Sequence, residues 1–128
     1  MSSDLYREII IDHYQNPRNY GRLEGADIGW REPNPLCGDV IEMQVKFGPD
    51  GKASEVKFDG DGCAISKASA SLLTEMILGK NLEELEKLGK KEILDALGID
   101  PGPSRLKCAL LPLQSLKLGI MAYKEKRK

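Results

Sequence analysis

The sequence predicts an α+β fold in which helices cover a small antiparallel sheet of about three strands. Two segments that alternate apolar and polar residues flank a tight turn, which is typical of a β-hairpin. One helical segment precedes this hairpin and several follow it, so the helices can pack on one face of the sheet. The length of 128 residues and the hydrophobic content of 41% fit one domain, residues 1–128, with a core of its own.

The chain is expected to begin with an amphipathic helix over residues 4–15, where apolar side chains recur at helical spacing. Pro17 ends it, because the residue before a proline is pushed out of the helical region. Residues 16–38 contain several glycines and prolines and predict a long loop that is packed or functional. A short strand near residues 23–28 is possible within this loop.

The central hairpin is expected to join a strand over residues 40–47 to a strand over residues 53–59. Between them, residues 48–51 read Gly-Pro-Asp-Gly, which is a strong turn sequence. On the second strand, one face is expected to carry Ser54, Val56 and Phe58.

The C-terminal half is expected to be helical, beginning with a helix over residues 64–78 that Gly79 ends. Asn81 and the glutamate three residues later resemble a capping box for a second helix. A third, short helix is expected over residues 91–97.

A proline inside a helix costs about 3 kcal/mol, whereas the first helical turn tolerates it. Because of Pro112, the last helix is therefore expected to begin near Cys108. The basic residues 124–128 are expected to form a frayed tail.

Charge and composition narrow the classes of function. Lys and Arg number 19 against 20 Asp and Glu, so no net field favours nucleic acid or a membrane as partner. The N-terminus lacks a signal-peptide pattern, which favours a cytoplasmic protein. Three cysteines cannot form a closed set of disulfides, so they are expected to be buried thiols, reactive thiols or ligands.

Four side chains are candidates for a shared site. Cys63 and Cys108 fall at expected helix starts, where the helix dipole favours a thiolate. Cys37 and Asp39 flank a glycine at the entrance to the first hairpin strand. Three thiolates and a carboxylate can bind zinc or hold an iron–sulfur cluster. Spacing alone leaves open the alternative that the three thiols pack as small hydrophobic side chains.

Five further residues are interpreted more simply. His13 is expected to pack or lie at the surface rather than bind metal, and Trp30 to be a core or partner contact. Asp61 is expected to be a turn residue. Arg105 and Lys107 either stabilise thiolates and meet an acidic partner, or form a solvated basic pair.

Four blocks of the sequence resemble the IscU/NifU N-terminal family of iron–sulfur cluster assembly scaffolds, and most closely its SufU branch. They comprise residues 5–7 with 12–19, 34–39, 60–71 and 105–109. The resemblance implies an α+β fold with a metal or cluster site at one exposed end. It implies that Cys37, Cys63 and Cys108 receive sulfur or bind metal, with Asp39 close by. It also implies a cysteine desulfurase as partner and iron–sulfur acceptor proteins as recipients.

The sequence departs from the IscU pattern at Lys107, where IscU-type chains carry a histidine before the third cysteine. Protonated lysine has no lone pair for a metal, which makes Asp39 the expected fourth ligand. SufU-type chains share this feature, bind zinc and accept persulfide sulfur. The short connection between Cys63 and Cys108 instead resembles IscU-type chains, whereas residues 101–105 replace the Leu-Pro-Pro-Val-Lys motif that a chaperone recognises.

These features predict a scaffold and sulfur acceptor that takes sulfur from a cysteine desulfurase and assembles or relays it as a [2Fe–2S] cluster. The alternative is a zinc-dependent sulfurtransferase of the SufU type that stimulates the desulfurase without holding a cluster. In that mechanism zinc activates a thiolate, assigned to Cys108 as sulfur acceptor. The simplest alternative is a structural zinc domain, whose site would be saturated and unreactive.

Overall fold

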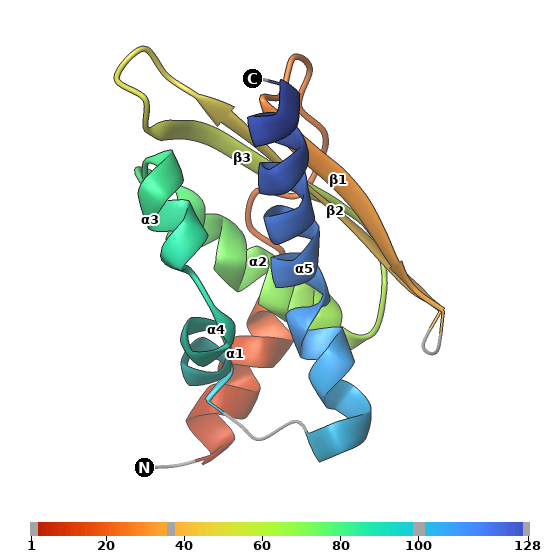
Figure 1. The fold of residues 1–128 in the computed structure, drawn as a ribbon. Helices are drawn as coiled ribbons and strands as arrows, with labels where there is room; N and C mark the ends of the chain where they lie inside the picture. Colours follow the sequence, from red (N-terminus) through yellow and green to blue (C-terminus); the bar gives the residue numbers. More distant parts are fainter. Residues whose placement is uncertain (1–2, 36–37, 99–101, 127–128) are drawn as a thin grey trace.

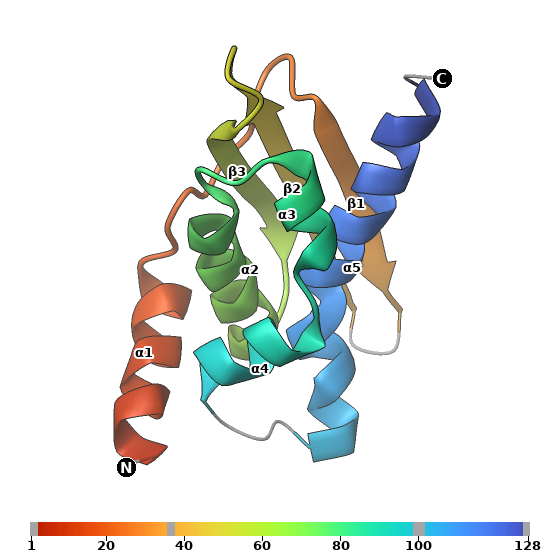
Figure 2. The same ribbon diagram turned by 60° about the vertical axis from the view of Figure 1, so that its left-hand side comes forward.

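Helices cover one face of a three-stranded antiparallel sheet in a computed structural model that describes residues 3–35, 38–98 and 102–126 (Figures 1 and 2). The strands lie in the order β1-β2-β3, so the predicted α+β fold is confirmed. In chain order the elements are α1 (Ser3–Gln15), β1 (Ile28–Asn34), β2 (Asp39–Phe47), β3 (Ala53–Asp61), α2 (Ala64–Ile77), α3 (Leu82–Lys87), α4 (Lys90–Leu97) and α5 (Gly102–Lys126).

The strand register brings three chain segments together at one end of the sheet. Asn34, the last residue of β1, pairs with Asp39, the first residue of β2. Val40 pairs with Asp61, where β3 ends. The end of β3 and the start of α2 therefore lie beside the start of β2.

The sheet differs from the prediction in two places. The strand expected near residues 23–28 is β1 and runs instead over Ile28–Asn34. In β3, Ala53 and Val56 are buried while Ser54 is exposed, so Ser54 does not share the face of Val56 and Phe58. The physical reason is a register shift between Lys46 and Phe47 of β2, which breaks simple alternation at the start of the paired strand.

The core lies between the sheet and the helices α2 and α5 (Figure 2). α5 approaches β1 closely, because a Cβ added at Gly119 would lie 2.8 Å from the side chain of Ile28. α1 packs on the outside of α2. The largest fully buried side chains include those of Ile41, Met43, Val56, Phe58, Leu73, Ile77 and Leu116.

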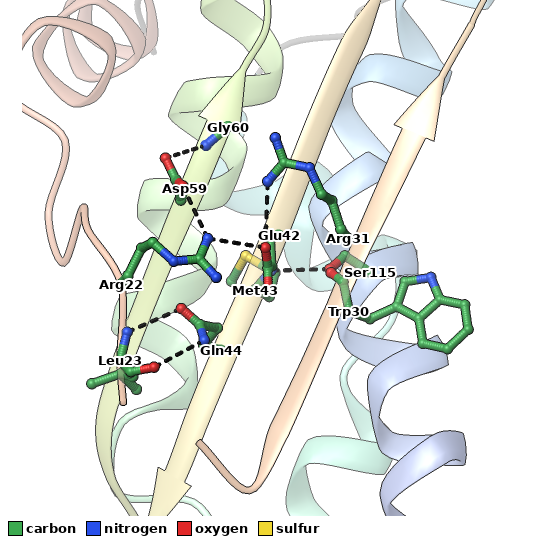
Figure 3. Close-up of polar contacts among 10 residues, drawn as sticks. All are labelled: Arg22, Leu23, Trp30, Arg31, Glu42, Met43, Gln44, Asp59, Gly60 and Ser115. Atoms are coloured by element: carbon green, nitrogen blue, oxygen red, sulfur yellow. Dashed lines mark hydrogen bonds and ion pairs between the residues drawn. The ribbon is translucent and has the colours of Figure 1, made fainter. Parts of the chain in front are cut away.

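The segment between α1 and β1 packs on the sheet, as the prediction of a packed loop requires. The amide of Leu23 donates to the side chain of Gln44 at 3.0 Å, and Gln44 donates back to the Leu23 carbonyl at 3.1 Å (Figure 3). The guanidinium of Arg22 lies 3.2 Å from carboxylate oxygens of both Glu42 and Asp59 (Figure 3). These contacts tie the segment to β2 and β3.

The helices α2, α3 and α4 begin and end close to the predicted residues. α2 ends at Ile77, after which Gly79 adopts a φ of 84°. Asn81 and Glu84 form the predicted reciprocal capping box at the start of α3. α4 begins at Lys90, one residue earlier than predicted.

The last helix is longer than the sequence predicts. α5 begins at Gly102, so both Cys108 and Pro112 lie inside it, and it continues through Lys126. Residues 124–126, expected in a frayed tail, are thus helical. Within the described ranges, no helix combines the length and apolar character that crossing a membrane would need.

Candidate metal centre

Three of the four predicted site residues meet at the end of the sheet. Asp39, Cys63 and Cys108 each offer one ligand atom, and these atoms lie within 4.8 Å of one another. Asp39 and Cys108 are 5% and 1% exposed, whereas Cys63 is only partly buried. The fourth predicted residue, Cys37, lies outside the described residues. The group therefore combines two thiols and a carboxylate, with Cys63 on its more accessible side.

Asp39 is positioned by the strand pairing and by two glycines. It opens β2, and a Cβ added at Gly62 would lie 3.2 Å from its Cγ and 2.2 Å from Oγ of Ser66. Gly60 has a φ of 133°, and a Cβ there would lie 2.0 Å from the Val40 carbonyl oxygen. Only glycine at these positions lets the end of β3 approach β2 so closely. The carboxylate of Asp39 therefore lies directly against the chain that leads to Cys63.

Cys63 lies at the start of α2, as predicted. It is the N-cap residue, with φ −73° and ψ 172°, and its thiol makes no capping hydrogen bond. The hydroxyl of Ser66 donates to the Cys63 carbonyl at 3.1 Å.

Cys108 reaches the site from inside a helix, so the prediction that it begins α5 is wrong. Since α5 begins at Gly102, the N-terminal dipole argument does not apply to this thiol. Its place is set by packing between α2 and α5, where the Ser69 hydroxyl donates to the Ala109 carbonyl at 2.6 Å. Tertiary packing rather than a helix end thus brings Cys108 to the site.

The residues present fit a bound metal ion. Within the described part of the chain, Oδ2 of Asp39 is the buried side-chain oxygen or nitrogen that has no hydrogen-bond partner. A buried carboxylate oxygen without a partner is costly, and a cation would compensate it. Two thiols and one carboxylate are the donor types that bind zinc or iron in proteins.

The other candidates lie outside this group. His13 is buried and packs against α2, with Nδ1 2.7 Å from Oγ of Ser71, as expected for a packing residue. Asp61 is exposed and is the last residue of β3, paired with Val40, so the prediction of a turn residue is wrong. Trp30 is 37% exposed on β1, so it is not a core residue. Lys107 lines an open groove of about 330 Å³ beside the site.

The environment of His13 disfavours its charged form. Burial and the nearby guanidinium of Arg18 lower the pKa of His13 below its usual 6.5, although Glu75 opposes this shift. Oγ of Ser71 also accepts the Arg18 amide at 2.9 Å. The Ser71 hydroxyl proton is then available to Nδ1 of His13, which suits a neutral imidazole. His13 therefore links α1 to α2 and does not belong to the metal centre.

Sequence reasoning missed three residues that support the group, namely Gly62, Ser66 and Ser69. The only sequence signal was the glycine directly before Cys63, which marks a close approach of the backbone. Ser66 bonds locally to the Cys63 carbonyl at the start of α2. The partner of the Ser69 hydroxyl, the Ala109 carbonyl, lies in α5 and is brought near only by the tertiary structure.

The fold and the Cys/Asp group together define a class of small α+β proteins with a group of possible soft-metal ligands at one end of the sheet. The chain belongs to the NifU-like N terminal domain family, whose model matches residues 5–128. The resemblance predicted from the sequence blocks is thereby confirmed.

Curated relatives cover nearly the whole chain. An iron–sulfur cluster assembly scaffold protein IscU of Rickettsia prowazekii is 38% identical over 95% of this chain and 94% of its own length. The zinc-dependent sulfurtransferase SufU of Bacillus subtilis is also 38% identical, over 91% of this chain and 89% of its own length.

A solved structure shows the same arrangement. A Fervidobacterium islandicum protein, described as a candidate iron–sulfur cluster assembly scaffold for the SUF system, superposes with a TM-score of 0.77 at 29% identity. The match covers 94% of this chain and 99% of the other. The IscU scaffold protein and the SufU sulfurtransferase are each 38% identical to this chain. Overall identity therefore does not distinguish the two functions, and the chemistry of the site must do so.

Proposed function

We propose that this chain is an iron–sulfur cluster assembly protein that accepts sulfur from a cysteine desulfurase and assembles or relays it as a [2Fe–2S] cluster. The observation that carries the proposal is the convergence of Asp39, Cys63 and Cys108 within 4.8 Å, with Oδ2 of Asp39 buried and unpaired. Family membership supports it, because relatives of both kinds are named for iron–sulfur assembly or sulfur transfer.

Four residues are proposed to hold the cargo. Cys63 and Cys108 supply soft thiolates and Asp39 supplies a hard oxygen. Cys37 is proposed as the fourth ligand, because it lies two residues before Asp39 in the sequence. Ligands from separate strands and helices can move apart, which suits a site that must surrender its cluster.

The sulfur step needs one free thiolate. This thiolate attacks the outer sulfur of the desulfurase persulfide, forms a new S–S bond, and releases the desulfurase cysteine as a thiolate. The role of Cys108 as acceptor stays a prediction. At 1% exposure its thiol is closed to a partner, so acceptance by Cys108 requires local opening of the site, whereas Cys63 is more accessible.

The second candidate is a zinc-dependent sulfurtransferase. Lys107, which is exposed and precedes Cys108, favours it, because a lysine cannot take the ligand role of a histidine. In this function zinc is a resident ion held by the same residues. Zinc would lower the pKa of a coordinated thiol and keep it ready for attack on a persulfide.

Anaerobic purification and a desulfurase assay test the proposal. Brown protein with stoichiometric iron and sulfide after addition of desulfurase, cysteine and iron supports the scaffold. Colourless protein with one bound zinc that accelerates desulfurase turnover supports the sulfurtransferase. Zinc protein that leaves turnover unchanged contradicts both and leaves a structural zinc domain.

Matched cysteine variants identify the acceptor. Cys108→Ser is expected to abolish transfer of labelled persulfide sulfur, and Cys63→Ser, which removes a more exposed thiol, serves as its comparison. If Cys108→Ser still accepts sulfur, the acceptor is Cys63 or Cys37. Mass spectrometry of trapped persulfides distinguishes these outcomes.

A further inference from the structure

We infer that Pro112 positions Cys108 in the metal centre by altering the helical turn that carries its thiol. The inference rests on the proposed function, because it assumes that Cys108 is a ligand. Pro112 is buried inside α5, and the helix continues on both sides of it from Gly102 to Lys126. A proline inside a helix is unfavourable, by about 3 kcal/mol or more in general. Its presence here therefore calls for a compensating role.

The proline acts on the cysteine through the backbone. In a regular helix, the amide of each residue donates to the carbonyl four residues earlier. For position 112 that carbonyl belongs to Cys108. Pro112 has no N–H to donate, and its ring crowds the same carbonyl. The turn from Cys108 to Pro112 therefore lacks one backbone hydrogen bond of a regular helix, and this turn carries the thiol.

A side chain from α2 supports this turn. The buried hydroxyl of Ser69 donates to the carbonyl of Ala109, the residue after Cys108, at 2.6 Å. Ser69 lies on the helix whose N-cap is Cys63. The contact therefore fixes the cysteine-bearing turn of α5 against the helix that carries the other thiol.

The two features together set the distance between the ligands. Sγ of Cys108 lies within 4.8 Å of the ligand atoms of Asp39 and Cys63, although Cys108 is inside a helix rather than at its end. A regular turn would draw the Cys108 carbonyl toward the amide at position 112 and rotate the thiol with it. Pro112 is thus a positioning residue that acts through Cys108.

The test compares Pro112→Ala with a matched packing control, Leu113→Ala, in the full chain under reducing anaerobic conditions. The probe is Co²⁺, which reports thiolate ligands by its absorption. Pro112→Ala restores an amide donor and is expected to weaken Co²⁺ binding about 10- to 100-fold, the usual loss when a ligand loses its orienting partner. Its unfolding midpoint without metal should stay equal or rise. Leu113→Ala removes a neighbouring buried side chain and should lower the unfolding midpoint while Co²⁺ affinity is unchanged.

Amide hydrogen exchange supplies a readout that does not depend on metal. The new amide at position 112 of Pro112→Ala is expected to be protected, because it bonds to the Cys108 carbonyl. An unprotected amide, or unchanged Co²⁺ affinity, overturns the inference and leaves the proposed site intact. Equal losses of affinity in both variants also overturn it, since packing alone would explain them. Absence of thiolate-bound Co²⁺ in the unmodified protein overturns the proposed site together with this inference.

Discussion

Replacing Asp39 with asparagine should make the metal-free protein more stable and the zinc-loaded protein less stable than the unmodified chain. Oδ2 of Asp39 is buried without a hydrogen-bond partner, and the residue is 5% exposed. Without a metal, Oδ2 of Asp39 therefore has neither solvent nor a protein donor beside it. Asparagine has nearly the same shape and no charge, so it relieves the cost of burial but removes an anionic ligand.

The size of the effect follows from the buried oxygen. A buried polar group without a partner costs about 1–3 kcal/mol, and a charged one costs more. The asparagine amide is still a buried polar group, so the substitution relieves only the additional cost of the charge. On this basis we expect Asp39→Asn to raise the free energy of unfolding of the metal-free protein by about 2 kcal/mol. With an unfolding entropy of about 2.1 cal/mol/K per residue, this corresponds to a rise in Tm of about 7 °C.

With zinc bound, the unmodified protein should be more stable than Asp39→Asn. At a free zinc concentration of about 100 times Kd, binding adds about 2.7 kcal/mol to the unmodified protein, or about 10 °C in Tm. The zinc-induced rise in Tm should be far smaller for Asp39→Asn, because one anionic ligand is lost. Thermal unfolding with chelator and with buffered zinc measures both effects in the same samples.

Asp61→Asn is the matched control for this experiment. Asp61 lies at the same end of the sheet and carries the same charge, but it is exposed. Neither its Tm without metal nor its zinc-induced shift should change appreciably. If Asp39→Asn lowers the Tm of the metal-free protein, the carboxylate is already compensated and the reasoning is refuted. An unchanged zinc shift would remove Asp39 from the ligand set.

Two further predictions concern buried hydrogen bonds between elements of the fold. Ser115→Ala should lower the free energy of unfolding by about 1–3 kcal/mol in urea denaturation, because its buried hydroxyl accepts from the Met43 amide and donates to the Trp30 carbonyl between β2 and β1 (Figure 3). Unfolding stability should also fall as the pH drops below about 6.5, since the lowered pKa of His13 means that the unfolded chain binds its proton first. Above that pH this contribution is fully present, and His13→Asn should reduce the pH dependence in denaturation curves.

Each of these predictions has an outcome that contradicts it. Ser54→Ala removes an exposed serine of the neighbouring strand, so a loss equal to that of Ser115→Ala would exclude the bridging role. His13 is the only histidine in the sequence, so no other imidazole can account for the change of unfolding stability with pH. If unfolding stability depends on pH in the same way in His13→Asn, another group takes up the proton on unfolding.

The sequence predicted the elements with strong local signals. Alternating apolar and polar residues on both sides of residues 48–51 predicted the β2–β3 hairpin. The pair Asn81 and Glu84 predicted the start of α3. Two boundaries failed where tertiary contacts override local preference. β1 lies over Ile28–Asn34, where Pro33 hides the strand pattern. α5 continues through Pro112, so the rule that a proline belongs in a first turn misplaced its start.

The candidate site was predictable as a set of residues but not as a geometry. Residue types at junctions pointed to Cys63, Cys108 and Asp39, and the structure places their ligand atoms together. Cys37 stays a prediction. The supporting contacts of Gly62 and Ser69 were not predictable, because their partners lie far away in the sequence.

The sequence by itself determined the fold class, the family and the candidate donor residues, because periodicity, turn residues and residue types can be read along the chain. Only the tertiary structure decided that Cys108 is a buried thiol inside a helix and that Asp39 is left with an unpaired oxygen. Both facts depend on contacts among β2, α2 and α5, which are adjacent in space but not in sequence. Burial and hydrogen-bond partners are set only when such segments pack. Here that packing determines how the Cys108 thiol and the Asp39 carboxylate are exposed and paired.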